Sequence, residues 1–211
     1  PEQVIASVQA PRSLAIVGDD YVGMKPTMLV AEGDRVKLGQ PLFSDKKNPE
    51  VIYTSPGCGV VSAINRGYQR RLLSLVIELE GDEQVELKSY TSAELPSLSR
   101  DQIVADLVES GLWTALRVRP FSKVPAPGEQ PVALFINAMD TNPLAVDPAV
   151  VIAQRTEDFA RGVNILSRLP TGETFLCVDA AVKALVAGCQ LSSSVRLEEF
   201  AGPHPAGLSG T

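Results

Sequence analysis

The first part of the chain consists of short apolar runs separated by clusters of Gly, Asp, Asn and Pro. This pattern is typical of short strands joined by tight turns. We predict strands at 14–17, 27–30, 42–44, 51–54, 60–64 and 72–79. Strands this short and this close cannot form a doubly wound sheet, so they indicate a small sandwich or a flattened barrel.

Beyond residues 91–100 the pattern changes to longer helical segments that alternate with continuous apolar strands. Ser99 is a predicted N-cap for a helix that ends at Gly111, and 120–131 contains four prolines and is predicted to be a loop. Strands are predicted at 132–136, 174–178 and 195–200, and helices at 148–169 and 180–187. This order indicates a small parallel sheet with right-handed crossovers. Because its strands are apolar throughout, we expect both sheet faces to be covered.

Composition narrows the class of protein. The chain has 211 residues, 45% hydrophobic content and a net charge of −6, which allows one large domain or two small ones. An acidic chain is not expected to bind nucleic acid or to be held on anionic lipid by charge alone. No apolar run reaches the length of a spanning helix and no signal peptide is visible, so membrane attachment would require a protein partner.

Metal and nucleophilic chemistry find little support in the sequence. The three cysteines, Cys58, Cys177 and Cys189, are far apart, and His204 is the single histidine. They do not make a ligand set at metal-binding spacing, so we expect no metal site and interpret the cysteines as buried or free thiols of a reducing compartment. One histidine also excludes a credible Ser/His/Asp arrangement, and phosphate-binding motifs such as GxGxxG are absent. We therefore expect no catalytic residue in this chain.

Two motifs in the first part resemble the biotinyl/lipoyl carrier domain. They are GDRVKLGQPL at 33–42 and SPGCGVV at 55–61. The glycines permit tight turns, and the spaced Val and Leu residues can fill the core between two sheets. In carriers the intervening hairpin displays a modified lysine between two methionines. Here the equivalent position is Asn48, followed by Pro49, with Lys46 and Lys47 nearby. We interpret this as a retained fold without the swinging arm, against the alternative of modification at either lysine.

Longer strings along nearly the whole chain resemble the A subunit of bacterial sodium-pumping NADH:quinone oxidoreductases. They are YVGMKPTM (21–28), DKKNP (45–49), INRG (64–67), SGLWTALR (110–117), RPFSKVP (119–125), AMDTNPLA (138–145) and GPHPAG (202–207). The resemblance implies a mixed α/β protein. A biotinyl/lipoyl-like barrel-sandwich module is expected at 1–92, and a Rossmann-like parallel β-α-β domain, similar to the flavin subunit of respiratory complex I, at 93–211. A β-grasp domain and a helical tail of the family are expected beyond residue 211, which would make the chain a fragment.

The resemblance also implies the biological setting. The family complex passes electrons from NADH to ubiquinone and exports sodium ions. This chain is expected to be a peripheral subunit on the cytoplasmic face of the bacterial inner membrane. FMN, FAD, riboflavin and iron–sulfur centres are expected in partner subunits, both membrane-bound and peripheral, and ubiquinone is a candidate ligand. An independent flavin- or quinone-binding oxidoreductase domain is the alternative.

No cofactor is expected in the chain itself. In the flavin-binding relatives a loop of the type G-x-G-G-A-G-F-P cradles the flavin phosphate through backbone N–H groups. The corresponding segment here is 110–121, which retains Gly111 but carries Leu112, Trp113 and Leu116. Bulky side chains at these positions would obstruct a nucleotide, so we interpret the flavin site as lost.

Three groups of residues remain as candidate contacts for a quinone or a partner. They are Trp113, Arg117, Arg119, Phe121 and Lys123; Asp140 and Asn142; and His204. Trp113 either lines a stacking groove or caps the preceding helix against the core. Asp140 or Asn142 is a site residue beyond a strand end, or else Asp140 and Thr141 form hydrogen bonds in a helix-entry turn. His204 either donates a proton to a reduced quinone or packs in a rigid turn between two prolines.

Overall fold

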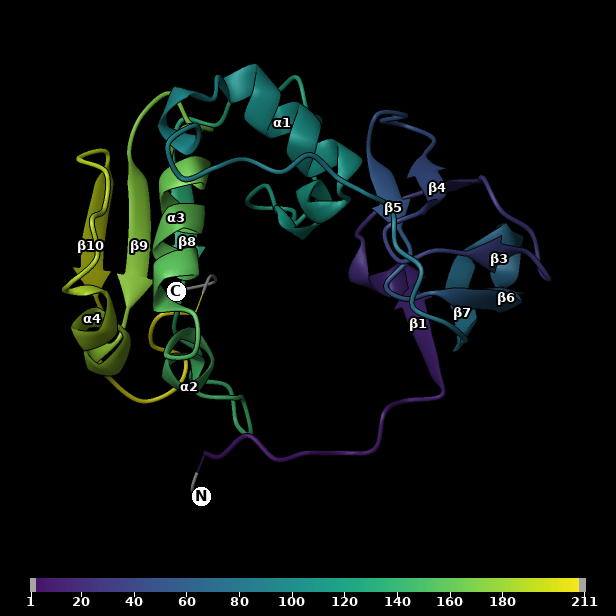
Figure 1. The fold of residues 1–211 in the computed structure, drawn as a ribbon, viewed down its shortest axis with the longest axis horizontal. Coiled ribbons are helices and arrows are strands. Elements are labelled where there is room, and N and C mark those ends of the chain that lie inside the picture. The colour runs from purple at the N-terminus through teal and green to yellow at the C-terminus, as the bar shows by residue number, and fades with distance from the viewer. Residues whose placement is uncertain (1–2, 209–211) are drawn as a thin grey trace. The chain divides into compact units, whose positions relative to one another are not determined.

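The computed structural model describes residues 3–208 (Figure 1). The chain divides into two compact units. The barrel unit contains residues 9–94 and 101–129, and the α/β unit contains residues 3–8, 95–100 and 130–208. Each unit is therefore built from segments that are not contiguous in the sequence. The predicted division of the sequence at residue 92 stays a prediction.

The barrel unit is an antiparallel β structure. Its strands are β1 (Ser13–Val17), β2 (Pro26–Met28), β3 (Arg35–Val36), β4 (Pro41–Asp45), β5 (Ile52–Thr54), β6 (Gly59–Arg66) and β7 (Leu72–Leu79). They form one sheet in the order β1-β7-β6-β3 and a second in the order β2-β4-β5. The six short strands predicted for this part of the chain are confirmed, with shifts of one or two residues at their ends in most cases.

Both sheets bury large apolar side chains. Phe43 of β4 and Tyr53 of β5 stack with their ring centroids 4.6 Å apart, and Leu75 and Ile77 of β7 are fully buried. Close backbone approach also matters. A Cβ on Gly59 would lie 1.9 Å from the carbonyl oxygen of Glu78, the residue on β7 next to Gly59's partner in the ladder. A side chain at position 59 would therefore force β6 and β7 apart.

Helical segments complete the barrel unit. They are α1 (Arg100–Glu109), whose first residue belongs to the α/β unit, and the 3₁₀ helices η1 (Gly18–Asp20), η2 (Tyr68–Arg70) and η4 (Leu112–Ala115). The remaining 3₁₀ helix, η3 (Leu95–Ser97), lies in the α/β unit. The helix predicted between Ser99 and Gly111 is confirmed. Gly111 adopts a φ of 77°, the left-handed conformation that commonly ends helices.

The α/β unit contains a parallel sheet. Its strands are β8 (Leu134–Asn137), β9 (Thr174–Val178) and β10 (Val195–Glu199), in the order β10-β9-β8. Both neighbouring pairs are parallel, and Leu176 at the centre is opposite Ile136 and Leu197. The predicted parallel β-α-β-α-β arrangement is confirmed, which makes the protein as a whole mixed α/β.

The helices of this unit are α2 (Pro148–Ile152), α3 (Thr156–Leu166) and α4 (Ala180–Val186). The prediction of one helix over 148–169 was wrong, because Arg155 has a φ of −145° and a ψ of 46° and separates α2 from α3. Aspartates fix two of the helix starts. Asp147 accepts a hydrogen bond from the backbone N–H of Ala149, and Asp179 accepts one from that of Val182, as expected for N-caps.

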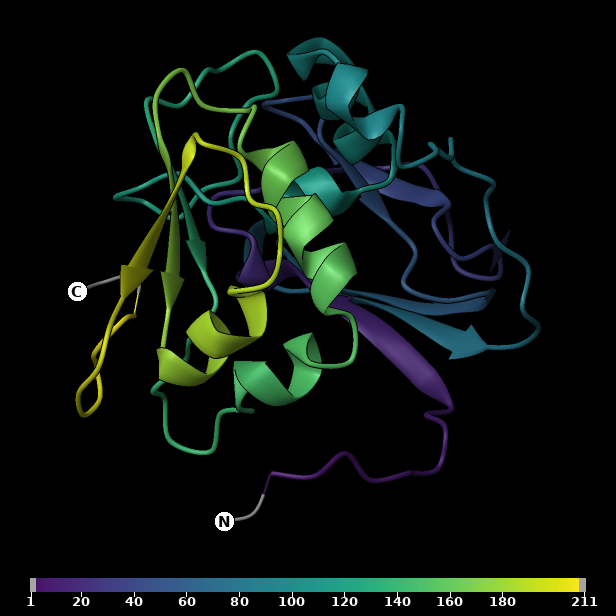
Figure 2. The same cartoon turned by 60° about the vertical axis from the view of Figure 1, so that its left-hand side comes forward.

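The helices cover one face of the sheet. Side chains of α3 and α4, including Val163 and Val182, pack with Leu176 and Val178 in one apolar core, and α2 adds partly buried residues. Figure 2 shows the three helices on the same side of the strands. The expectation of two covered faces was therefore wrong for the described residues, since Phe135 on the opposite face is 67% exposed.

That opposite face holds its own aromatic pair. The rings of Phe135 and Phe175 stack at 4.9 Å between centroids, and the Arg196 guanidinium lies 5.6 Å from the Phe175 centroid. The apolar runs of β8 and β9 thus have two different causes. One set of side chains fills the core, and the other forms a partly exposed ladder across the strands.

The close approach at Gly59 leads to a stability prediction. Gly59→Ala should lower the free energy of unfolding of the barrel unit by about 2–3 kcal/mol, because the added methyl group overlaps backbone of β7. The measurement is urea unfolding followed by fluorescence of Trp113, the single tryptophan, which lies in this unit. Gly128→Ala is the control: a Cβ there meets no atom within 4 Å, and it should change stability by less than about 0.5 kcal/mol. Equal stabilities of the two variants would contradict this packing.

Candidate functional site

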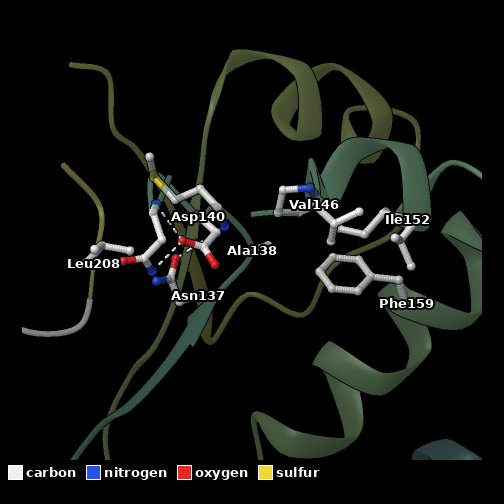
Figure 3. A pocket seen from close by; sticks show the side chains of 11 residues that line it. Asn137, Ala138, Asp140, Val146, Ile152, Phe159 and Leu208 are labelled. Carbon is white, nitrogen blue, oxygen red and sulfur yellow. Dashed lines mark hydrogen bonds between the residues drawn. The ribbon is translucent and has the colours of Figure 1, made fainter. Parts of the chain in front are cut away.

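A cavity of about 530 Å³ opens beyond the carboxyl end of β8 in the α/β unit (Figure 3). It is lined by Asn137, Ala138, Met139, Asp140, Asn142, Val146, Pro148, Val151, Ile152, Phe159 and Leu208. The volume lies in the range of small-molecule pockets. Its position agrees with the general rule that ligands of open parallel sheets bind outside the carboxyl ends of the strands.

One end of the cavity is polar. Asp140 Oδ1 accepts hydrogen bonds from the backbone N–H of Asn142 at 2.9 Å and from its side-chain amide at 2.8 Å. The sequence predicted turn hydrogen bonds for Asp140 and Thr141, but the turn joins Asp140 and Asn142, and the Thr141 hydroxyl donates to the carbonyl of Ala206 instead. Asp140 and Asn142 both line the cavity. The turn therefore holds a carboxylate and an amide at the cavity wall.

The other end of the cavity is apolar. Val146 precedes the N-cap of α2, Ile152 lies on α2, and Phe159 lies on α3 (Figure 3). Val151 of α2 also lines this end. Asp147 and Pro148 start α2 directly after Val146 and so bring this short helix to the cavity. The cavity thus combines an apolar wall with a few polar groups, which is the usual composition of a site for an amphipathic small molecule.

A turn near the C-terminal end of the described chain closes one side of the cavity. The Asn137 amide donates to the carbonyl of Gly207 at 2.7 Å, and the Thr141 hydroxyl donates to the carbonyl of Ala206 at 2.8 Å. Gly207 has a φ of 69°, and a Cβ there would lie 2.1 Å from Met139 Sδ. These contacts hold Leu208 at the cavity wall.

His204 belongs to the same turn but does not line the cavity. Its Nδ1 lies 3.1 Å from the carbonyl oxygen of Thr141, and its side chain is exposed. A ring nitrogen next to a carbonyl oxygen acts as a donor. This arrangement favours the interpretation of His204 as part of a rigid turn.

Trp113 lies in the barrel unit and is 2% exposed. Its indole N–H donates to the carbonyl of Pro125 at 2.9 Å. Gly111, two residues before it, packs on β5, where a Cβ would lie 2.3 Å from Thr54 Oγ1. The neighbouring Leu112 is 63% exposed. Trp113 therefore acts as a core residue of this unit, and its indole face is covered by protein.

The other predicted contacts of this segment are exposed. Phe121 is 70% exposed, with the Lys123 ammonium 5.8 Å from its ring centroid. The Arg117 guanidinium donates to the carbonyl of Asp20 at 3.3 Å and lies 5.5 Å from the Tyr21 centroid. Arg119 donates to the Ser122 hydroxyl at 3.3 Å. The structure thus separates the buried Trp113 from a surface of cations around Phe121.

Sequence reasoning missed the apolar wall of the cavity and one buried polar group. Ile152 and Phe159 have the spacing of ordinary helix core residues, so the sequence carries no signal that distinguishes a pocket wall from a filled core.

In the barrel unit the Tyr53 hydroxyl is buried without a hydrogen-bond partner among the described residues. Burial raises the pKa of Tyr53, and the nearby Asp45 carboxylate adds to the shift.

Two further properties concern the residues that the structure describes. Their helices include none with the length and hydropathy needed to cross a bilayer. Over the same residues, His, Cys, Asp and Glu side chains form no group of three or more that could hold a metal ion. Cys58, Cys177 and Cys189 are free thiols.

The clasp between Asn137 and Gly207 can be tested directly. Asn137→Ala should weaken the attachment of the 203–208 turn by about 1 kcal/mol, which corresponds to roughly fivefold faster amide exchange at Leu208. Hydrogen-exchange mass spectrometry measures this rate. Asn142→Ala is the matched control, since the Asn142 side chain bonds only to Asp140 in the described chain. Equal exchange in the two variants would argue against the clasp.

Comparison with known proteins places this architecture in a family. Residues 1–80 match the model of the NqrA N-terminal barrel-sandwich hybrid domain, and residues 98–211 match that of the NqrA second alpha/beta domain. These matches confirm the predicted barrel-sandwich module.

Curated relatives are similar along the full chain. Each is named as the A subunit of a Na(+)-translocating NADH-quinone reductase, and identities are 56% for Pseudomonas aeruginosa (strain UCBPP-PA14), 53% for Yersinia pseudotuberculosis and 51% for Pasteurella multocida. The alignments cover 100% of this chain and 46–47% of the relatives, so the chain spans about half their length. Because the second-domain model alone matches more than half of the 211 residues, the chain belongs to the NqrA family.

Proposed function

We propose that this chain acts within a sodium-translocating NADH:quinone oxidoreductase, as the cofactor-free, peripheral part of its A subunit. The observation that carries the proposal is the alignment of all 211 residues with relatives of that name at 51–56% identity. Both domain families also occur in the order expected for this subunit. Chance similarity does not extend through two successive domains at this level.

The absence of a flavin is proposed from packing. We infer that the α/β unit is Rossmann-like and related to the flavin subunit of complex I. In such flavin-binding relatives, a phosphate lies against open backbone N–H groups of a glycine-rich loop. In this chain the space beside Gly111 is filled by Thr54, and Trp113 occupies the interior. The residues present do not fit a flavin phosphate, so electron transfer is assigned to FMN, FAD, riboflavin and iron–sulfur centres of partner subunits.

The location follows from the same proposal. This subunit is expected on the cytoplasmic face of the bacterial inner membrane, attached through membrane and peripheral subunits of the complex. The net charge of −6 supports attachment through protein contacts, because an acidic surface is repelled on average by anionic lipid headgroups.

A contribution to ubiquinone binding is proposed for the cavity beyond β8. Its apolar wall of Val151, Ile152 and Phe159 suits a quinone ring and the first part of an isoprenoid chain. At the polar end, the Asp140 carboxylate can accept a hydrogen bond from the hydroxyl of a reduced quinone. The cavity would therefore discriminate quinol from quinone through its acceptor, while the apolar wall binds both.

Purification gives the first test. The protein is expected to have the mass of its polypeptide alone and no flavin absorbance band, because the segment that would hold the phosphate is filled by side chains. Intact-mass spectrometry and an absorbance spectrum of the same preparation measure both properties. The assembled complex, which should show flavin absorbance, is the positive control. One FMN per chain in the isolated protein would refute the cofactor-free assignment.

Photoreactive ubiquinone gives the second test, in the assembled complex. Label is expected on peptides that line the cavity, and Val151→Trp should reduce it roughly fivefold by filling the cavity from its partly exposed wall. Val132→Trp is the matched control, since Val132 is 80% exposed in the same unit and does not line the cavity. If label is absent from this chain, or if both variants label equally, the cavity has no role in binding quinone.

A further inference from the structure

Six exposed cations of the barrel unit come together from three segments that are distant in the sequence. The segments are 20–25, which follows β1, 45–47 in the β4–β5 hairpin, and 117–123 after η4. The cations are Lys25, Lys46, Lys47, Arg117, Arg119 and Lys123, and we call this surface the cationic patch.

Backbone contacts hold the three segments in place. The Lys46 N–H donates to the carbonyl of Lys25 at 2.7 Å, and the Lys47 ammonium donates to the carbonyl of Gly23 at 3.3 Å. Lys123 reaches the same point, with Cε 3.7 Å from an ideal Cβ built on Gly23. Arg117 joins the group through the carbonyl of Asp20. The cations are thus gathered by the fold and are not independent surface side chains.

The charge of the patch is poorly compensated within the described chain. None of the six cations forms an ion pair there, whereas Arg35, Arg71 and Lys88 of the same unit each pair with a carboxylate. Like charges on neighbouring segments repel one another, so the arrangement costs free energy in the isolated protein.

The acidic residues in and beside these segments do not remove this excess. Asp45 is 9% exposed, and its Oδ1 accepts the backbone N–H groups of Lys25 and Lys47. Asp20 is exposed and lies next to Tyr21, and Glu50 follows the hairpin tip. Six cations against three carboxylates leave a net positive surface on a chain whose overall charge is −6.

Apolar side chains are exposed beside the charges. Phe121 is 70% exposed and Val22 is 49% exposed. Lys123 lies over the Phe121 ring, so a charge and an aromatic face are presented together. Arginine combined with aromatic residues is characteristic of protein–protein interfaces, whose polar rim surrounds an apolar centre.

We propose that the cationic patch is the docking surface for an acidic segment of a partner subunit, with carboxylates on both sides of an apolar side chain that packs on Phe121. This inference rests on the proposed function, because it assigns to this patch a contact with the membrane-bound part of the complex. A protein segment fits better than a lipid surface, since the patch is small, structurally fixed and surrounded by an acidic molecule that anionic lipid would repel.

The test is binding of the full-length protein to membranes prepared from cells that lack only this subunit. The patch variant carries Lys46→Glu, Lys47→Glu and Lys123→Glu, and the matched control carries Arg12→Glu, Lys37→Glu and Arg70→Glu. These control residues are exposed cations of the same unit outside the patch, and each variant changes the net charge equally. The patch variant should bind about tenfold more weakly at low salt, with the control within about twofold of wild type.

The outcomes separate this inference from the proposed function. If wild type binds and the patch variant binds equally well, the patch is not the docking surface, although membership of the complex stands. If wild type does not bind these membranes, both are overturned. A third arm uses protein-free vesicles of phosphatidylglycerol and phosphatidylethanolamine. If wild type binds these vesicles, and the patch variant loses vesicle binding to the same extent as membrane binding, the patch recognises lipid headgroups. That result would overturn the proposal of a protein partner.

Discussion

Gly111 ends helix α1 in a left-handed conformation and lies directly against Thr54 of β5, with no room for a Cβ between them. The Thr54 hydroxyl also donates to the carbonyl of Ser110 at 3.3 Å. From there Trp113 enters the interior, and the following cations emerge on the surface around Phe121. The glycine that could cradle a phosphate is therefore used for backbone packing, and the indole that could stack on a ligand is buried. The proposed loss of a nucleotide site and gain of a docking surface are two consequences of one packing arrangement.

The sequence predicts the elements well because each is encoded locally. The strands of the barrel unit carry turn residues at both ends, and Asp147 and Asp179 mark helix starts through hydrogen bonds to residues two or three positions ahead. The break between α2 and α3 was missed because the sequence between them, 153–155, contains neither glycine nor proline. The uncovered sheet face was missed because Phe135 and Phe175 have the pattern of core residues in an apolar run.

Longer-range features are harder to predict from one sequence. The segment 101–129 begins with helical periodicity like that of the part of the chain that follows it, and the second-domain family model includes the whole segment. Its contacts nevertheless group it with the barrel unit. One of these contacts is the packing of Gly111 on Thr54. The two residues are more than fifty positions apart in the sequence, so local patterns do not reveal that they touch. Of the candidate site, Asp140 and Asn142 were found from their position after a strand, although Thr141 was wrongly expected to share the turn with Asp140. The apolar wall that makes a cavity beside them came only from the packing of α2 and α3.

The β4–β5 hairpin shows how a carrier-like fold can serve a different purpose. A carrier requires a lysine at the end of a free hairpin, so that the attached group can move between sites. In this chain the hairpin is tied to the 20–25 segment through the Lys46 backbone and the Lys47 ammonium, and Asp45 is held between them by two backbone N–H groups. Such anchoring restricts the motion on which a swinging arm depends. What it provides is a set of positive charges in a fixed geometry, which is suited to recognising a structured partner.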